Sequence, residues 1–411
     1  MNIRSLTEAC AGLWPEAKKF LQEMVTLNSF TTHPLQVNRV GELVASRFGR
    51  LGFTPSFVPH ASDVYGSHLV LKHAPQAGRP TVALLAHLDT VFPPDEEVKN
   101  AFHWREEGSR IYGPGTNDIK GGIALIFLML AVLQEQWPDL FNSVNWVVLC
   151  NACEEIDSED FGVVCRQQLP PDTLACLIFE ADGEKGDRGR LVTERKGRAT
   201  FRIDVRGRGA HAGSQDARGA NAIVQLGRVI GDLDALTNYD AGLTVNVGTI
   251  CGGTVINRVP ETASAELEVR ASSVRVFEDA KNSIRALEGV GDLRSRDEDA
   301  HPCQIQVSQI DETVPWPKND ASERLFSFWE AAGRETGCEV TAGSRGGLSD
   351  GNVLWSYFPT LDGLGPQGDH AHCSENDPAI GKEQEYVEAG SFVPKAVLNI
   401  AAIARLVGVS G

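Results

Sequence analysis

The first 180 residues alternate short apolar runs with longer amphipathic segments. Four of the runs have the length of buried strands, at 68–72, 81–86, 144–151 and 174–179. Segments 15–29 and 37–51 repeat apolar residues at helical spacing. Segment 121–134 is apolar nearly all round, as expected of a helix buried against a sheet. This alternation predicts an α/β domain whose mostly parallel sheet is covered by helices.

The order of the elements changes near residue 197. A strand, a helix, two strands, a helix and a strand follow, at 199–205, 217–236, 243–250, 263–271, 274–287 and 303–310. This order is that of the ferredoxin-like unit, and about a hundred residues suffice for a separate domain. We therefore predict an inserted α+β domain at 197–312, between two parts of the α/β domain at 1–196 and 313–411.

The α/β pattern resumes after the inserted domain. A helix is expected at 321–336, and short strands are expected near Val340 and Thr360. The closing segment, 384–407, is expected to form one helix. A chain of 411 residues is too long for one ordinary core, which agrees with two domains.

Composition and charge narrow the classes of partner. The net charge of −17 argues against nucleic-acid and anionic-membrane partners, because the phosphate-neutralising attraction is missing. The opening residues contain no apolar segment of signal-peptide length, and the longest apolar run, 123–133, is too short to span a membrane. The nine cysteines are scattered, apart from Cys150-x-x-Cys153, and are expected to be reduced. We expect a cytoplasmic protein.

Polar side chains follow the predicted strands at the points where they end. One apolar run ends in His87, and Asp89 follows two residues later on the same face of the strand. The next two strands lead to Glu154, Glu155 and Glu180. Because parallel strands deliver their carboxyl ends to one edge of a sheet, these side chains are expected to converge there.

Two further segments add candidate metal ligands. The loop GPGTNDIKGG places Asp118 directly before the buried helix, where a carboxylate can bridge two cations. The late segment GDHAHCSE offers His370 and His372. The candidate ligands are thus two imidazoles and three carboxylates, from His87, Asp118, Glu155, Glu180 and one of the two late histidines. Such a set suits two zinc-like ions about 3.5–4 Å apart.

Seven segments that span nearly the whole chain carry a resemblance to known proteins. They are AHLDTVF, YGPGTNDIKGG, NACEEIDSEDFG, IFEADG, GRGAHAG, CGGTVINRVPETASAELEVRA and GLGPQGDHAHCSE. In this order they resemble the dizinc family of glutamate carboxypeptidase, acetylornithine deacetylase, succinyl-diaminopimelate desuccinylase and aminoacylase, and are closest to glutamate carboxypeptidase-like members. The resemblance implies a zinc-binding α/β catalytic domain interrupted by a smaller lid through which two subunits form a homodimer.

The resemblance also implies how two zinc ions would be held. His87, Asp118 and Glu180 would bind one ion, and Asp118, Glu155 and His372 would bind the second, so that Asp118 bridges them. Cobalt or manganese could replace zinc. The choice of His372 rests on the Cys-Ser-Glu that follows it, as in similar sequences.

The remaining roles in the catalytic domain come from the same resemblance. Asp89 would hydrogen-bond His87 and fix its tautomer. Glu154 would be the general base for attack of a metal-bridging water on an amide bond. A glutamate at the position of Glu180 is more associated with carboxypeptidases and acyl-amino-acid hydrolases than with aminopeptidases.

Residues of the lid and of a late loop are implied to meet the substrate. His211 would reach the partner subunit's site and stabilise the oxyanion. Asn257 and Arg270 would hold the substrate, with Arg270 as bidentate partner of a free carboxylate. Gly347 and Ser349 belong to the implied pocket loop. A plain surface role at the end of a strand stays open for Arg270.

The expected activity is zinc-dependent hydrolysis of an amide bond next to a free carboxylate, in a peptide or an N-acyl amino acid. The first alternative is a deacylase of the acetylornithine deacetylase or desuccinylase type. A second is a serine hydrolase, because Gly347-Leu-Ser349-Asp-Gly351 fits a nucleophile elbow, with Asp362 or Asp369 and then His372 in the required order. A third is a metal-free binding or scaffolding protein.

Overall fold

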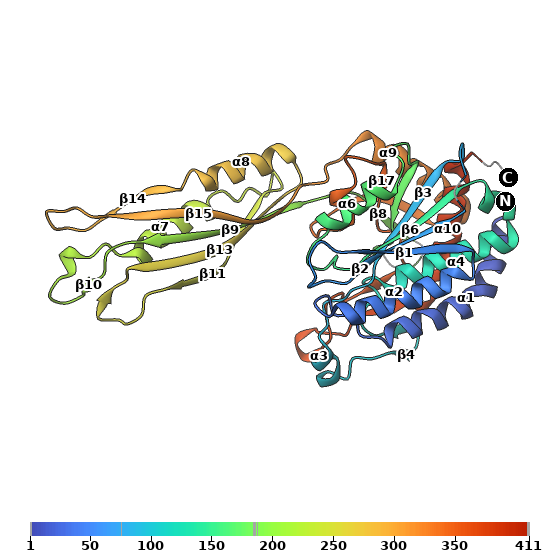
Figure 1. Cartoon of the computed structure of the whole chain (residues 1–411), viewed down its shortest axis with the longest axis horizontal. Helices are drawn as coiled ribbons and strands as arrows, with labels where there is room; N and C mark the ends of the chain where they lie inside the picture. The colour runs from blue at the N-terminus through green and yellow to red at the C-terminus, as the bar shows by residue number, and fades with distance from the viewer. Residues whose placement is uncertain (1, 75, 184–185, 187, 409–411) are drawn as a thin grey trace. The chain divides into compact units, whose positions relative to one another are not determined.

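A computed structural model of the chain describes residues 2–74, 76–183, 186 and 188–408. The chain divides into two compact units whose elements are labelled in Figure 1. The first, here called the α/β unit, comprises Met1–Thr193, Lys318–Ser344 and Ser349–Gly411. The second, called the α+β unit, comprises Glu194–Pro317 and Arg345–Leu348. The short loop Arg345–Leu348 thus belongs to the α+β unit, although it follows the helix that resumes the α/β pattern.

The α/β unit is built on a sheet of six strands. In spatial order they are β1 (Phe53–Pro59), β2 (Ser67–His73), β6 (Asn145–Asn151), β3 (Thr81–His87), β7 (Ala175–Ile178) and β17 (Thr360–Leu361). The four strands from β6 to β17 are parallel to one another, and β1 and β2 form an antiparallel edge. The mostly parallel sheet predicted from the apolar runs is therefore confirmed.

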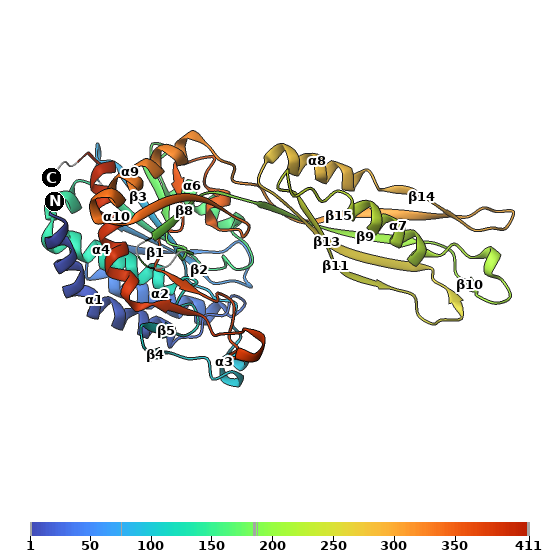
Figure 2. The ribbon, with the colours of Figure 1, turned by 180° about the vertical axis from the view of Figure 1, so that it is seen from behind.

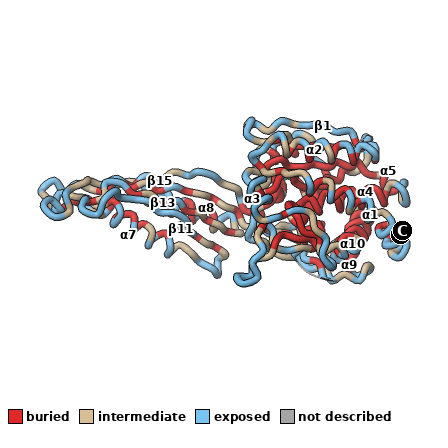
Figure 3. Tube along the Cα trace, turned by 90° about the horizontal axis from the view of Figure 1, so that it is seen from below, coloured by how far each residue is buried: buried red, intermediate tan, exposed pale blue. Residues whose placement is uncertain are grey.

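Helices cover both faces of this sheet. The larger core contains α1 (Ile3–Val25), α2 (Pro34–Gly49), α4 (Lys120–Gln136), α9 (Asp320–Thr336) and α10 (Phe392–Leu406). The opposite face packs against α6 (Glu159–Gln168) and the 3-10 turn η2 (Asp350–Val353). Figures 1 and 2 show α1, α4 and α10 side by side, and in Figure 3 the buried chain gathers inside this unit. As predicted, α4 is buried continuously over its first fourteen residues.

The end of the chain differs from the prediction of one closing helix. Residues 386–391 form β19 (Tyr386–Glu388) and the turn η4 (Ala389–Ser391), and α10 begins only at Phe392. The reason is tertiary, because β19 pairs with β5 (Arg110–Tyr112) in a sheet with β4 (Arg105–Glu107) and β18 (Gly368–Asp369). Among the described residues, Ala389–Leu406 is the one helical segment long and apolar enough to cross a membrane, and 67% of it is buried inside the fold.

The α+β unit is an antiparallel sheet with two helices. Its strands are, in spatial order, β11 (Thr244–Gly252), β13 (Thr262–Ala271), β9 (Gly197–Arg206), β15 (Pro302–Thr313) and β14 (Gly289–Arg294). Helices α7 (Ala222–Asp234) and α8 (Val274–Arg285) share its core. The first four strands have the ferredoxin-like order expected from the sequence. The fifth, β14, was not predicted, because its sequence GVGDLR lacks an alternating apolar pattern.

Helix α4 approaches the end of β7 so closely that a side chain is excluded at Gly122. A Cβ there would lie 2.3 Å from the carbonyl oxygen of Phe179. We expect Gly122→Ala to lower the free energy of unfolding by about 1–3 kcal/mol, because the backbone must shift. Gly12→Ala in α1 meets nothing within 4 Å and should instead raise it by about 0.5–1 kcal/mol. Calorimetric melting measures both, and equal melting temperatures would contradict the close packing.

Candidate metal centre

Three parallel strands deliver polar side chains to one edge of the sheet. His87 ends β3 and lies in register with Asn151, which ends β6 and leads to Glu154. Glu180 follows β7. The His87 Nε2 lies 3.9 Å from Glu180 Oε1 and 4.0 Å from Glu154 Oε2. It also lies 2.9 Å from Oδ1 of Asp118, from the loop before α4. The convergence expected from the strand ends is thus present.

A second imidazole faces the same aspartate from the other side. The His372 Nε2 lies 3.1 Å from Asp118 Oδ2 and 3.1 Å from Glu155 Oε2. The other histidine of that segment, His370, has its Nε2 3.6 Å from Glu383 Oε2. The structure therefore brings His372 to the cluster, and each oxygen of the Asp118 carboxylate faces one imidazole.

The cluster fits divalent cations. Ligand atoms of His87, Asp118 and Glu155 lie within 4.8 Å of one another, and so do those of His87, Glu154 and Glu180. Oε1 of Glu155 is buried and accepts no hydrogen bond. Nitrogen and carboxylate donors at this spacing suit zinc and similar ions. Geometry places both Glu154 and Glu155 near His87, but only Glu155 also contacts His372.

Burial and close charges shift the pKa values of the cluster. Burial opposes ionisation of Asp118, but hydrogen bonds from His372 and His87 outweigh it and hold the pKa of Asp118 well below its usual value. Burial, aided by the Asp118 charge, raises the pKa of Glu155 to about 7. Hydrogen bonds to Asp118 and Glu155 raise the pKa of His372 to about 11. Burial raises the pKa of Glu154 well above its ordinary value. Without a cation, this cluster holds protons near neutral pH.

Asp89 supports both the imidazole and the glutamate turn. His87 Nδ1 lies 3.0 Å from the carbonyl oxygen of Asp89 and 3.3 Å from its carboxylate, so the Nδ1 proton faces Asp89. Nε2, which faces Asp118, would become the ligand nitrogen once a cation displaces its proton. The Asp89 carboxylate accepts the backbone N–H groups of Glu154 at 3.1 Å and Glu155 at 3.3 Å. It also accepts the hydroxyl of Thr31 at 2.8 Å.

Two supporting residues were missed from the sequence. Thr31 is the hydroxyl donor to Asp89, and Glu385 accepts the backbone N–H groups of Asn117 and Asp118. Both residues act on segments far away along the chain. No local pattern pointed to either, because a single threonine and a glutamate within a polar stretch are typical of exposed positions.

In the α+β unit, the structure places His211 beside Asn257. The two-residue strand β10 (Ala210–His211) pairs with β12 (Arg258–Val259), and Ala212 N–H donates to the Asn257 carbonyl at 3.0 Å. His211 is exposed, and its Nδ1 accepts the N–H groups of Gly213 and Ser214, both at 3.1 Å. In the neutral ring the proton is therefore on Nε2, which is a hydrogen-bond donor.

Arg270 is already paired within its own strand. Its Nε and Nη2 donate to the two carboxylate oxygens of Glu268, at 3.0 and 3.2 Å, and its Nη1 donates to the Gly346 carbonyl at 2.9 Å. The side chain is 27% exposed. The bidentate carboxylate expected from a substrate is thus supplied here by a neighbouring residue.

Ser349 is buried at the start of η2 and has a structural partner for each hydrogen-bonding role. Its Oγ donates to Asp362 at 2.9 Å and accepts the N–H of Gly351 at 3.1 Å. His372, the histidine of the serine-hydrolase alternative, instead contacts Asp118. The expected triad is therefore not assembled among the described residues. The preceding Gly347 accepts a hydrogen bond from Arg195 through its carbonyl at 2.9 Å.

A second histidine group, His60, His68 and Asp160, also has metal-like spacing. Each imidazole accepts a backbone N–H at Nδ1, from Ser62 at 2.9 Å and from Ala152 at 3.2 Å. The protons are therefore on Nε2, the nitrogen that faces Asp160. Coordination through Nε2 would move each proton onto a nitrogen that already faces a donor. We assign this group no metal.

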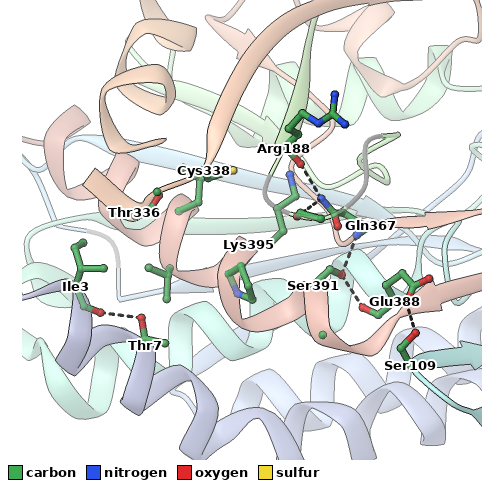
Figure 4. Close-up of a pocket in the computed structure, with 16 residues that line it drawn as sticks. Ile3, Thr7, Ser109, Arg188, Thr336, Cys338, Gln367, Glu388, Ser391 and Lys395 are labelled. Carbon is green, nitrogen blue, oxygen red and sulfur yellow. Dashed lines mark hydrogen bonds between the residues drawn. The ribbon is translucent and has the colours of Figure 1, made fainter. Parts of the chain in front are cut away.

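A cavity of about 700 Å³ lies elsewhere in the α/β unit, lined in part by residues of α1, α9 and α10 (Figure 4). It contains none of the candidate metal ligands. Its charged Lys395 lies 2.7 Å from the Asp182 carboxylate, and its Gln367 donates to the Arg188 carbonyl at 2.8 Å. Because these lining groups are already paired, we assign the cavity no ligand.

Metal binding should release protons. At pH 7 the metal-free site holds a proton on His372, whose pKa is raised to about 11, and part of one on Glu155, whose pKa is raised to about 7. A cation must displace them, so metal affinity should rise between pH 6 and 8. Titration calorimetry in buffers of different ionisation enthalpy measures the protons released. An apparent enthalpy that does not depend on the buffer would contradict this charge state.

Comparison with known proteins finds similarity along most of the chain. Residues 193–289 match the M20 family model described as a peptidase dimerisation domain. Carboxypeptidase G2 of Pseudomonas sp. (strain RS-16) is 24% identical over 374 residues, which cover 90% of this chain and 86% of that protein. Succinyl-diaminopimelate desuccinylase of Paracidovorax citrulli is 25% identical over 348 residues, which cover 80% and 85%.

Solved structures show the same fold. An M20 family metallo-carboxypeptidase from Sulfolobus solfataricus superposes with a TM-score of 0.72 at 15% identity, covering 95% of this chain and 99% of that one. An aminopeptidase from Bacillus cereus gives 0.75 at 21% identity, covering 96% and 98%. These matches show that the chain is similar in sequence and in fold to M20 metallopeptidases and amidohydrolases, and that its residues 193–289 match a peptidase dimerisation domain.

Proposed function

We propose that the protein is a two-zinc exopeptidase that hydrolyses an amide bond next to a free carboxylate. The observation that carries this proposal is the placement of Asp118 between two imidazoles, with one carboxylate oxygen toward His87 and the other toward His372. A carboxylate placed in this way can bridge two neighbouring cations, with one oxygen toward each. Similarity along most of the chain to a protein named as a carboxypeptidase supports the choice of substrate class.

The contacts support the ligand assignment that the sequence resemblance implies. His87, Asp118 and Glu180 would hold one ion, and Asp118, Glu155 and His372 the other. Bound zinc would polarise the scissile carbonyl and make a water molecule more acidic. Cobalt or manganese could serve in place of zinc, because the donors are imidazole and carboxylate groups.

Glu154 is proposed as the proton carrier. The backbone N–H of Glu154 donates to the Asp89 carboxylate. The carboxylate of Glu154 lies 4.0 Å from His87 Nε2, beyond hydrogen-bond distance. The carboxylate accepts a proton from the attacking water as the oxygen bonds to the carbonyl carbon. It returns that proton to the leaving nitrogen as the C–N bond breaks, so one water is consumed for one acid and one amine. Burial, which raises the pKa of Glu154, makes its carboxylate a stronger base than that of an exposed glutamate.

The α+β unit is proposed to dimerise and to supply an oxyanion donor. His211 presents Nε2–H to the outside because two backbone N–H groups occupy Nδ1. A neutral imidazole fixed in this tautomer is suited to donate to a developing negative charge. We propose that it does so in the partner subunit's site, with Asn257 next to it as a substrate contact.

Deacylation of N-acyl amino acids is the second candidate. Relatives named as a desuccinylase and as an acetylornithine deacetylase favour it. Both candidate reactions break an amide bond and leave the same residues in the same roles. A panel of dipeptides and N-acyl amino acids, assayed with the zinc-loaded dimer, separates the two by their kcat/KM values.

The two adjacent glutamates should respond differently to the same substitution. Glu154→Gln should lower kcat by about 10²–10⁴ while two ions per subunit remain, since it removes the base alone. Glu155→Gln should lower the metal content, since it removes a ligand. Metal analysis and steady-state kinetics on both variants test this. Full activity of Glu154→Gln would remove Glu154 from the role of base.

A substrate carboxylate must compete with Glu268 for Arg270. Glu268→Gln should therefore lower KM for carboxylate substrates, and Arg270→Gln should raise it about ten- to a hundredfold, as expected for one charged hydrogen-bond pair. Glu266→Gln is the matched control, because Glu266 lies on the same strand and pairs with Arg202. If Arg270→Gln leaves KM unchanged, the arginine is only a structural partner of Glu268 and of the Gly346 carbonyl.

A further inference from the structure

Glu385 is a buried carboxylate directly before β19 whose side chain holds the loop that carries Asp118. It is 0% exposed. Its Oε1 accepts two consecutive backbone N–H groups, from Asn117 at 2.9 Å and from Asp118 at 3.1 Å. One carboxyl oxygen thus satisfies two buried backbone donors that would otherwise be left without a partner. The backbone at Asp118, the proposed bridging residue, is therefore held by the side chain of Glu385.

The backbone of the same residue holds the segment that carries His372. The Glu385 N–H donates to the carbonyl of Cys373, the residue after His372, at 2.8 Å. The Glu385 carbonyl accepts the N–H of Gly113, at the start of the Asp118 loop, at 3.4 Å. One residue thus joins two segments whose side chains meet at 3.1 Å, between His372 Nε2 and Asp118 Oδ2.

The His372 segment needs such an anchor. Both His370 and His372 have positive φ, 58° and 65° respectively. For residues with a Cβ this left-handed conformation is strained, so it persists where neighbouring contacts impose it. The bond from Glu385 to Cys373 is one of these contacts, and Gln384 adds another through its side-chain donation to the Ser374 carbonyl at 2.9 Å.

The surroundings of the second carboxyl oxygen of Glu385 indicate that packing stability alone does not account for a glutamate at this position. Oε2 is buried and accepts no hydrogen bond. Burying a carboxyl group with one oxygen unsatisfied costs free energy, so a residue selected only for packing would be apolar. The arrangement is comparable to that of Asp89, which accepts the consecutive N–H groups of Glu154 and Glu155.

We propose that Glu385 is a positioning residue that sets the distance between Asp118 and His372, and thereby the affinity for the ion that these two residues would share. This inference rests on the proposed two-ion function. The other ion, held by His87, Asp118 and Glu180, shares only the Asp118 ligand with this one. Its affinity should therefore depend less strongly on Glu385. Glu385 itself touches neither the substrate nor an ion.

The test compares Glu385→Ala and Glu385→Gln with the wild-type dimer. Each protein is stripped of metal, titrated with zinc and then mixed with a chelator, and the ions bound and their release rates are measured. Glu385→Ala should weaken one of the two ions about ten- to a hundredfold, the usual effect of removing a residue that orients a ligand. Glu385→Gln keeps an oxygen acceptor for both N–H groups and should recover part of this loss. kcat should fall in the same order while KM changes less than threefold.

The control is Glu388→Gln at the far end of β19, where Glu388 pairs with Arg110 near the surface. It should release both ions at the wild-type rate. If Glu385→Ala and Glu385→Gln hold both ions as tightly as the wild type, or lose both ions equally, Glu385 does not position the shared ion. A wild-type protein that binds fewer than two ions would instead overturn the proposed function. Should Glu385→Ala fail to fold, Glu385→Gln decides alone, and wild-type release of both its ions would overturn the proposal.

Discussion

The structure of the candidate site is governed by the repulsion between carboxylates crowded at one buried sheet edge. The side chains of Asp118, Glu154, Glu155 and Glu180 are between 5% and 18% exposed, and His87 is fully buried. Such groups cannot all be ionised in a dry site unless positive charge lies between them. His87 and His372 supply part of it in the metal-free protein, and divalent cations would supply the rest. The cluster is costly for stability, and this cost is itself an argument for function.

The turns that carry the cluster are held in place by hydrogen bonds from their backbone N–H groups to two acidic side chains. Asp89 and Glu385 each accept two consecutive N–H groups from the turns that carry the candidate ligands. Both anchors are themselves buried acidic side chains, and burial, aided by the Asp118 charge, raises the pKa of Glu385 to about 8. A cation bound at the centre would favour the ionised form of Glu385, so it would be attracted by its ligands and also by this anchor.

The parts of the fold and site that were predictable have local signals. His87, Glu154 and Glu180 each follow a strong apolar run, so their convergence followed from the alternation of strands and helices. Glu385 and β19 could not be predicted in this way, because Tyr386–Glu388 form a strand through pairing with β18 and with β5, and β5 is far away along the chain. The late helix was for this reason expected to begin eight residues too early.

The pairing of Arg270 with Glu268, unlike the position of Glu385, could have been predicted from the sequence. Glu268 and Arg270 occur two residues apart on a predicted strand, and such side chains leave on the same face. The resemblance to a carboxylate-binding family predicts a substrate as the partner of Arg270, whereas the strand geometry alone predicts Glu268. On a strand, a charged side chain at i−2 or i+2 can therefore compete with a ligand for the same arginine.

The anchors also constrain how the site can form. Thr31 and Asp89 precede the inserted α+β unit in the chain, whereas His372 and Glu385 follow it. The half of the cluster around His87, Glu154 and Glu180 can be assembled from segments before the insertion alone. The half around Asp118 and His372 requires the returning chain, whose contacts are long in sequence and therefore slow to close. Asp118 belongs to both halves. We therefore expect its loop to become fully fixed only after Glu385 has packed against it, so that the bridging carboxylate is the last part of the site to form.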